Sequence, residues 1–189
     1  MKSLQKQYKE EIHPALLKEL KLKNVMAIPR LEKIVINCGL GEATQDKKAI
    51  ETMSKQIAVI TGQKPLITRA KKAISAFKLR EGDAIGLKVT LRKKHMYDFM
   101  TKLIRIALPR VRDFRGIQTS GFDGRGNYTF GVLDQSIFPE LEYSMIDKTR
   151  GFQITFVTSA TKNEHAKKLL TLFGLPFKKK KEEKIEKKS

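Results

Sequence analysis

The chain has little that a disulfide scaffold, a secreted protein or a membrane protein needs. Cys38 is the only cysteine among 189 residues, which excludes an internal disulfide and a cysteine-based zinc site and fits a reducing compartment. The first twenty residues lack an apolar run of signal-peptide length, and Glu10, Glu11 and Glu19 are unlike an acid-poor transit sequence. We therefore expect a cytoplasmic protein that stays in the compartment where it is made.

Acidic residues are also scarce. Twenty Asp and Glu stand against thirty-nine Lys and Arg, a formal charge of +19, and self-repulsion of that size is tolerable mainly when a polyanion neutralises it. An anionic membrane surface is the alternative polyanion, but it normally requires a long apolar span or a basic amphipathic helix with a strong apolar stripe, and neither is found. The expected partner is nucleic acid, with no membrane contact.

Groups for catalysis are poorly placed. The three histidines lie far apart without metal-ligand spacing, and the stretch GFDGRGNYTFG has neither P-loop spacing nor the context of a dinucleotide site. Asp113, Asp123 and Asp134 are the acids that a metal-dependent nuclease site would use, yet each lies beside turn residues or an arginine. We expect no catalytic residue, metal or cofactor.

What the chain does have is a series of periodic apolar patterns over residues 1–177, which we interpret as a single domain. Helical spacing, interrupted by Pro14, predicts an N-terminal helical arm over residues 1–22. Alternation predicts strands, and three- and four-residue apolar spacing predicts helices. The predicted strands are 31–37, 65–70, 84–92, 128–133 and 151–158, and the predicted helices are 46–60, 94–108 and a last one capped by Asn163.

This order of elements predicts an α+β fold, with an antiparallel-rich sheet that has helices on one face and an open basic face on the other. The tail at 178–189 has seven Lys, three Glu and only one apolar residue, Ile185, so it cannot bury a core and is predicted to be disordered.

Three of the predicted strands share a division between an apolar side and a polar side. The polar sides carry Lys33, Asn37, Lys88, Thr90, Arg92, Gln153 and Thr155. Cationic side chains bind phosphates, and hydroxyl and amide side chains form hydrogen bonds with ribose hydroxyls or base edges. A protein that recognises the shallow groove of an RNA helix needs both kinds of side chain. These sides carry no aromatic residue for base stacking, which favours duplex RNA, and Gly86 would permit a close backbone approach. For any single residue, a solvated strand face explains the pattern equally well.

Positive charge is concentrated between Lys64 and Lys94, where ten Lys or Arg and two acids give a net +8. The segment at 71–82 lies between two predicted strands and is expected to project as a basic loop. Phe77 either stacks on a base or sugar or packs back against the domain. A second basic stretch contains Arg105, Arg110, Arg112 and Arg115. Two interpretations stay open: it binds RNA or acidic neighbouring proteins, or it is only the charged end of a helix.

Four stretches, NVMAIPRLEKIVINCGLGEA, ITGQKPLITRAKKAISAFKLREGDAIGLKVTLR, PRVRDFRGI and SGFDGRGNYTFGV, resemble the bacterial-type fifth protein of the large ribosomal subunit. The similarity covers residues 1–177. The resemblance implies a non-enzymatic protein that binds 5S ribosomal RNA in the central protuberance, contacts P-site transfer RNA and bridges to a small-subunit ribosomal protein. It also implies contact with large-subunit ribosomal RNA and neighbouring large-subunit proteins.

The resemblance also implies site residues. The positions that match the family's 5S-contacting residues are Lys33, Asn37, Gln63 and Thr90, and the open face adds Lys88 and Arg92. The candidates for transfer RNA and small-subunit contacts, in the family's projecting loop, are Lys71, Lys72, Phe77, Lys78 and Arg80. The alternatives are a free RNA-binding regulator or a nucleic-acid enzyme, and the Lys-rich tail has no motif to carry over.

Overall fold

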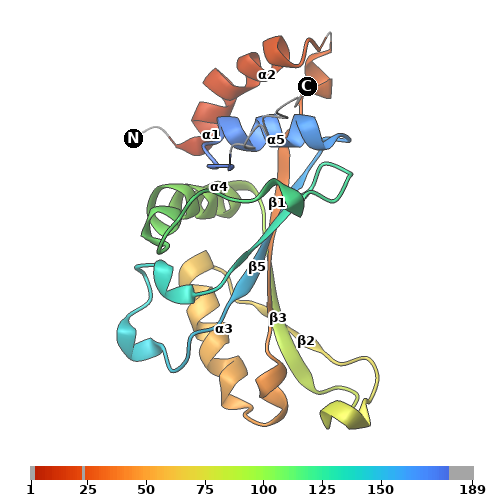
Figure 1. Cartoon of the computed structure of the whole chain (residues 1–189), viewed down its shortest axis with the longest axis vertical. Coiled ribbons are helices and arrows are strands. Elements are labelled where there is room, and N and C mark those ends of the chain that lie inside the picture. Colours follow the sequence, from red (N-terminus) through yellow and green to blue (C-terminus); the bar gives the residue numbers. More distant parts are fainter. Residues whose placement is uncertain (1–2, 23, 179–189) are drawn as a thin grey trace, which may run out of the picture.

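Five strands form one antiparallel sheet in the part of the chain that the computed structural model describes, residues 3–22 and 24–178. Their order across the sheet is β2-β3-β1-β5-β4, so β1 lies at the centre (Figure 1). The strands are β1 (Leu31–Gly39), β2 (Leu66–Arg69), β3 (Ala84–Leu91), β4 (Tyr128–Val132) and β5 (Phe152–Thr158). The predicted α+β class with an antiparallel sheet is confirmed.

The sheet has one covered face and one open face because its strands alternate as the sequence predicts. In β1 the side chains of Ile34 and Ile36 are buried, whereas Val35 is half-buried and Asn37 is exposed. The same division runs through β3 and β5 in register with β1. All apolar sides therefore meet on one face.

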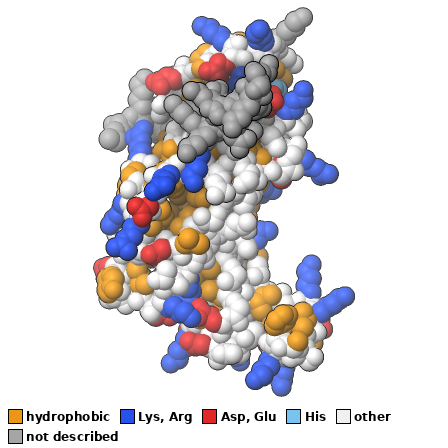
Figure 2. All heavy atoms as spheres, viewed as in Figure 1, with side chains coloured by type: hydrophobic (Ala, Val, Ile, Leu, Met, Phe, Trp, Pro, Cys, Tyr) orange, Lys and Arg blue, Asp and Glu red, His pale blue; other side chains and the backbone are white. Residues whose placement is uncertain are grey.

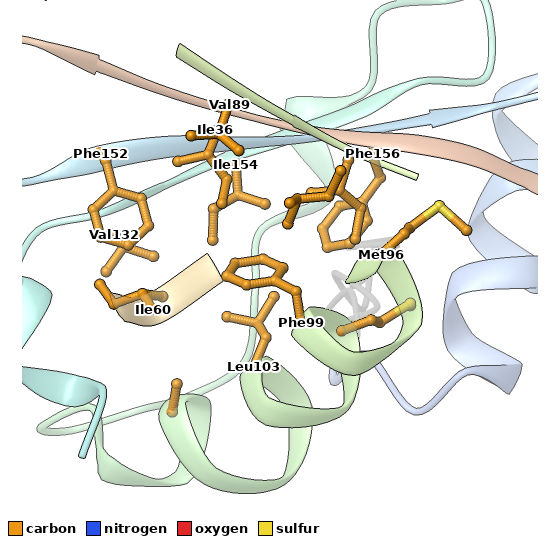
Figure 3. Close-up of a cluster of buried hydrophobic side chains, with 14 of the residues drawn as sticks. Ile36, Ile60, Val89, Met96, Phe99, Leu103, Val132, Phe152, Ile154 and Phe156 are labelled. Atoms are coloured by element: carbon orange, nitrogen blue, oxygen red, sulfur yellow. The ribbon is translucent and has the colours of Figure 1, made fainter. Parts of the chain in front are cut away.

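Helices α3 (Lys48–Thr61) and α4 (Lys93–Lys102) cover that apolar face (Figure 1). Figure 3 shows Phe99 of α4 lying between the sheet residues Ile154 and Phe156 and the helix residue Leu103. Phe99, Ile154 and Phe156 are all fully buried. Gly62, just after α3, adopts a left-handed φ of 69° and donates its N–H to the Ala58 carbonyl, which ends the helix.

The helical arm consists of α1 (Leu4–Gln7), the π-helical segment η1 (Tyr8–Ile12) and α2 (His13–Glu19). Pro14 lies in the first turn of α2, and the wider π turn before it accommodates a residue that has no backbone N–H to donate. The predicted apolar stripe of the arm is buried at Leu4, Ile12 and Leu16. The Tyr8 ring stacks on Phe173 at 5.5 Å between centroids, and burial raises its pKa to about 12.

The last helix, α5 (Asn163–Leu172), carries Phe173 at its end. The predicted cap at Asn163 is wrong, because Lys162 occupies the N-cap position and makes no side-chain cap. Asn163 Oδ1 instead accepts a hydrogen bond of 3.0 Å from the N–H of Gly126. Its amide therefore joins α5 to the turn before β4, a contact that local sequence cannot reveal.

Short helical segments occur between these elements. They are η2 (Val25–Ala27), η3 (Gly41–Thr44), η4 (Ser75–Phe77), η5 (Leu103–Ala107), η6 (Leu108–Arg110), η7 (Thr119–Gly121), η8 (Gln135–Ile137) and η9 (Tyr143–Met145). The segments η5 and η6 prolong α4 past its α-helical end, so the predicted helix 94–108 is present only in part as α-helix.

The loop between β4 and β5 is fixed by Arg150, whose side chain is only 7% exposed. The guanidinium donates to both carboxylate oxygens of Asp147 and to Glu42, which lies in η3. Lys148 adds an ion pair of 2.8 Å to Glu42. Hydrogen bonds from Lys148, which has the larger effect, and from Arg150 lower the pKa of Glu42. Arg150 also lowers the pKa of Asp147. The ion-pair cluster thus ties this loop to the chain just after β1.

Cys38 is buried near the end of β1, and its thiol donates to the Gly151 carbonyl at 3.3 Å. Among the described residues, no helix is both long and apolar enough to cross a bilayer. The predicted disordered tail lies outside the described residues, apart from Lys178.

Candidate nucleic-acid interface

The open face of the sheet brings the predicted RNA-binding residues of β1 and β3 together. Asn37 pairs with Lys88 on one side and with Gln153 on the other. All three side chains are exposed. The Cβ atoms of two residues that pair across antiparallel strands lie about 5 Å apart. This first row continues to Leu66 of β2 and Gly131 of β4.

A second row crosses the same face two residues further along each strand. Val35 of β1 pairs with Thr90 of β3 and with Thr155 of β5, and Thr155 pairs in turn with Thr129 of β4. The hydroxyls of Thr155 and Thr129 lie 3.0 Å apart and are hydrogen-bonded. This row presents hydroxyl groups and methyl groups but no charge.

Lys33 begins a third row, where it pairs with Val157. Arg92 follows the last residue of β3, is exposed and occupies the N-cap position of α4. The paired positions of the open face thus include Lys33 and Lys88 and no acid, so the face attracts phosphate.

Gln63, the one matched residue outside the strand patterns, lies in the turn from α3 to β2. It is exposed, and its backbone N–H donates to Thr61 Oγ1 at 3.2 Å, which fixes the turn after Gly62. Leu66 follows three residues later and pairs with Lys88. The turn therefore places Gln63 near the β2 end of the first row.

Gly86 belongs to the open face but leaves no free space there. A Cβ at this position would lie 2.6 Å from the Cys38 carbonyl oxygen and 2.9 Å from Thr68 Oγ1. The residue is buried between β1 and β2. The sequence suggests that Gly86 lets RNA approach the backbone closely. In the structure, the groups that approach it closely belong to the neighbouring strands β1 and β2.

The predicted basic loop forms a structured finger beyond the ends of β2 and β3 (Figure 1). Ile74 and Leu79 exchange two backbone hydrogen bonds of 2.9 and 3.1 Å, which brings its two sides together. At its base, Ala70 N–H donates to the Asp83 carbonyl at 2.8 Å, and Arg69 Nη1 donates to the Gly82 carbonyl at 2.9 Å. The tip is therefore held in place by its own backbone.

The tip carries exposed apolar side chains within a ring of cations. Phe77 is 71% exposed and Ile74 is 44% exposed, so Phe77 does not pack back against the domain. The exposed cations of the finger are Lys71, Lys72, Lys78 and Arg80. Figure 2 shows this lobe at the lower right, with hydrophobic side chains surrounded by Lys and Arg.

The two sets of candidate residues form two separate surfaces. The open-face residues lie along β1 and β3, whereas the finger joins β2 to the Ala84 end of β3, away from Thr90 and Arg92. A ligand that lies across the sheet therefore leaves the finger tip free for a second ligand.

The second basic stretch borders a groove of about 940 Å³ beside β4. Arg110, Arg112 and Lys178 line this groove together with Thr129 and Gly131 of the open face. Apolar side chains also line it, among them Phe114, Ile117, Phe130 and Val132, and Asp134 adds one acid. Arg110 and Arg112 are exposed, so positive charge returns beyond the last strand.

Two of the three acids considered for a nuclease site, Asp123 and Asp134, stabilise turns instead. Asp123 accepts hydrogen bonds from the backbone N–H groups of Arg125 and Asn127, and the Asn127 side-chain amide lowers its pKa. Asp134 accepts from Ser136 N–H at 2.7 Å and so caps η8. No group of three potential ligands is placed to hold a metal ion within residues 3–22 and 24–178.

Sequence reasoning recognised Gln153 and Thr155 as outward-facing but did not select them as site residues, and it did not consider Thr129 at all. The missing information is register: only the pairing of β5 with β1 and β4 places these side chains in the same rows as Asn37 and Thr90. A weak signal existed in the alternation of β5.

Two family models match the chain in succession. Residues 24–80 match the model described as ribosomal protein L5, and residues 84–177 match the one that describes the C-terminus of the same ribosomal family. The boundary between them falls in the finger, so the two segments share one sheet: β1 and β2 come from the first and β3 to β5 from the second.

Curated relatives agree over nearly the full length. A protein of Clostridium kluyveri, named large ribosomal subunit protein uL5, is 57% identical over 92% of this chain and 96% of its own. Proteins of the same name from Dichelobacter nodosus and Malacoplasma penetrans are 56% and 57% identical over 94% of this chain, and over 99% and 95% of their own lengths. The chain therefore belongs to the ribosomal protein L5 family and is a structural, non-enzymatic constituent of the large ribosomal subunit.

Proposed function

We propose that this chain binds 5S ribosomal RNA through the open face of its sheet, within the central protuberance of the cytoplasmic large subunit. The observation that carries the proposal is the strand register, which places Asn37 beside Lys88 and Val35 beside Thr90 on one solvent-facing surface. These residues, with Lys33 and Gln63, include the ones that the resemblance to the family indicates. Large-subunit ribosomal RNA and neighbouring large-subunit proteins would complete the surroundings.

The mechanism is scaffolding by a pre-formed surface. Helices α3 and α4 hold the sheet from behind, so the polar side chains are already in place before RNA arrives and little ordering entropy is lost on binding. Lys33, Lys88 and Arg92 displace counterions from phosphates, which supplies much of the affinity and makes it dependent on salt. Asn37 and Thr90 supply hydrogen bonds that depend on the shape of the RNA.

The test is a double substitution, Asn37→Ala with Thr90→Ala, in the full chain. Both side chains lie on the open face, and neither forms a hydrogen bond with the described residues, so their loss leaves the core intact and the fold unchanged. Two lost hydrogen bonds predict affinity for 5S RNA about tenfold weaker. Gln5→Ala, on the exposed side of α1, is the control. Unchanged affinity of the double variant contradicts the sheet-face assignment.

We further propose that the finger contacts P-site transfer RNA and a small-subunit ribosomal protein. Its exposed Phe77 and surrounding cations suit stacking on a base or sugar beside phosphates. Deletion of residues 72–80 removes the tip and leaves the hydrogen bond between Ala70 and Asp83 at its base. Binding to isolated 5S RNA should persist, whereas ribosomes with this variant should hold P-site transfer RNA less tightly. A large loss of 5S affinity would place the 5S site on the finger instead.

A further inference from the structure

Strand β4 is the last strand of the sheet and pairs with β5 on one side only. On its outer side, the segment that ends in η7 covers the start of the strand: a Cβ added to Gly121 would overlap the Thr129 carbonyl oxygen. This carbonyl therefore points outward. Because the direction of the backbone groups alternates along a strand, the N–H and the carbonyl of Gly131 point to the same outer side.

The outer edge is open at Gly131. Neither its N–H nor its carbonyl forms a hydrogen bond with the described residues on that side. A Cβ added there would meet no atom within 4 Å, so a second backbone has room to approach. An N–H and a carbonyl that are unpaired on a strand edge are the groups to which another extended chain can add.

The groove of about 940 Å³ follows this edge. It is lined by Thr129 and Gly131 from the open face of β4 and by Phe130 and Val132 from the covered face. A cavity that touches both faces of one strand lies along the edge of that strand and not on either face. Residues between 108 and 121 line it from the opposite side.

The opposite wall of the groove is held in place by hydrogen bonds. Tyr128 Oη, in β4, donates to the Gln118 carbonyl at 2.6 Å. Ile117 donates its N–H to the Pro176 carbonyl at 2.8 Å and accepts from the N–H of Lys178 at 2.9 Å. The groove is therefore formed in advance, and an incoming segment does not have to order it.

The charged lining favours an acidic occupant. Arg110, Arg112 and Lys178 are exposed, and Asp134 is the one acid among the lining residues. Neither arginine forms an ion pair with the described residues. The chain beyond Lys178 is a poorer match, because residues 179–189 contain six Lys and three Glu and like charges repel.

The apolar lining favours a peptide. Phe114 and Phe130 are half-buried in the groove, and Leu133, at its end, is 89% exposed. A nucleic acid could neutralise the arginines, but its backbone has no repeating N–H and carbonyl to pair with Gly131. An extended peptide supplies these groups and places successive side chains on opposite sides, where they meet the two faces of the β4 edge.

We infer that β4 is a docking edge for another protein, which adds an extended segment with alternating acidic and apolar residues as a further strand of the sheet. Its backbone pairs with Gly131, its apolar side chains contact the phenylalanines, and its carboxylates contact Arg110 and Arg112. The inference does not depend on the binding of 5S RNA, and it gives the second basic stretch a protein partner.

The probe is a fluorescent peptide of about seven residues that alternates glutamate and valine, titrated against the full chain. Gly131→Pro removes the outward N–H but no hydrogen bond to β5, and an edge strand tolerates proline at such a position. It should weaken binding at least about tenfold, whereas the control Gly131→Ala keeps the N–H and should bind like wild type. Arg110→Gln with Arg112→Gln should weaken binding about fivefold and reduce its salt dependence.

Amide hydrogen exchange of the wild-type chain, measured by NMR, tests the pairing without a substitution. The peptide should slow exchange at Gly131 at least about tenfold, and the same peptide with N-methylated amides should not. The inference is wrong if the peptide does not bind, or if it binds without protecting Gly131.

Three further outcomes would assign the edge to another occupant and also overturn the inference. Protection of Gly131 without peptide, lost in a chain that ends at Lys178, would show that the chain's own tail fills the groove. Protection that rises with protein concentration would indicate a second copy of the chain. Displacement of the peptide by a duplex RNA that itself protects Gly131 would make the groove an RNA site.

Discussion

Substitution of Gly86 by alanine separates two roles that the sequence allows for this residue. The new Cβ would lie 2.6 Å from the Cys38 carbonyl oxygen, well inside an ordinary contact, so the central β1–β3 pair must shift to admit it. Overpacking of this kind costs about 1–3 kcal/mol. Alanine also reduces the conformational entropy of the unfolded chain, which offsets about 0.5 kcal/mol of this cost. We expect Gly86→Ala to lower the free energy of unfolding by about 1.5 kcal/mol.

Gly131→Ala is the matched control, because Gly131 is an open-face glycine of β4 with no atom within 4 Å of its added Cβ. It should be neutral or slightly stabilising. Urea unfolding followed by circular dichroism measures both variants, and with a slope of about 2 kcal/mol per molar the Gly86→Ala midpoint should fall by about 0.7 M. A variant at Gly86 that is as stable as wild type but binds 5S RNA more weakly would refute the strand-packing explanation and restore the RNA-approach one.

Further predictions concern the ion-pair cluster and the finger. Arg150→Met should lower the free energy of unfolding by about 1–2 kcal/mol, since it removes the charge-assisted hydrogen bonds to Glu42 and Asp147 but leaves carboxylates that are partly exposed to water. The exposed Arg112→Met should change it by less than about 0.5 kcal/mol; equal stabilities would contradict a stabilising role for the cluster. In the folded protein the pKa values of Glu42 and Asp147 are lowered. Their contribution to the free energy of unfolding is therefore complete above the unfolded pKa and is lost as the pH falls through the folded pKa values. Unfolding curves measured from about pH 7 to about pH 3 should show a loss of stability toward acid pH that is smaller in Arg150→Met than in wild type. Phe77→Ala should leave the unfolding midpoint in place, since its ring is 71% exposed; a marked loss of stability would show that the ring packs on the domain.

The elements that could be predicted are those whose signal is local. Each of three patterns indicates an element with one buried face: the alternation at 31–37, the alternation at 84–92 and the apolar stripe at 46–60. The structure contains β1, β3 and α3 at these places. Helix α3 ends next to the end of the predicted helix 46–60, where Gly62 adopts the left-handed conformation that glycine favours. The open face followed as well, because the polar sides of strands in one sheet must meet on the same surface.

What could not be predicted depends on contacts between distant parts of the chain. Arg150 and Glu42 are 108 residues apart in sequence, and nothing near either residue indicates the other. Asn163 has the composition of a helix cap, but its amide is taken by Gly126. The roles of Gly86 and of Gln153 depend on register across the sheet, which alternation alone does not fix.

The central claim is that the open face recognises the shape of 5S RNA and not only its charge. The most direct measurement is a titration of the wild-type chain with 5S ribosomal RNA and with an unrelated duplex RNA of equal length, each at low and at moderate salt. We predict that 5S RNA keeps a clear advantage at moderate salt, because the hydrogen bonds of the open face are screened far less than its phosphate contacts. Equal affinities that collapse together as salt rises would contradict the account and leave a generic basic RNA binder.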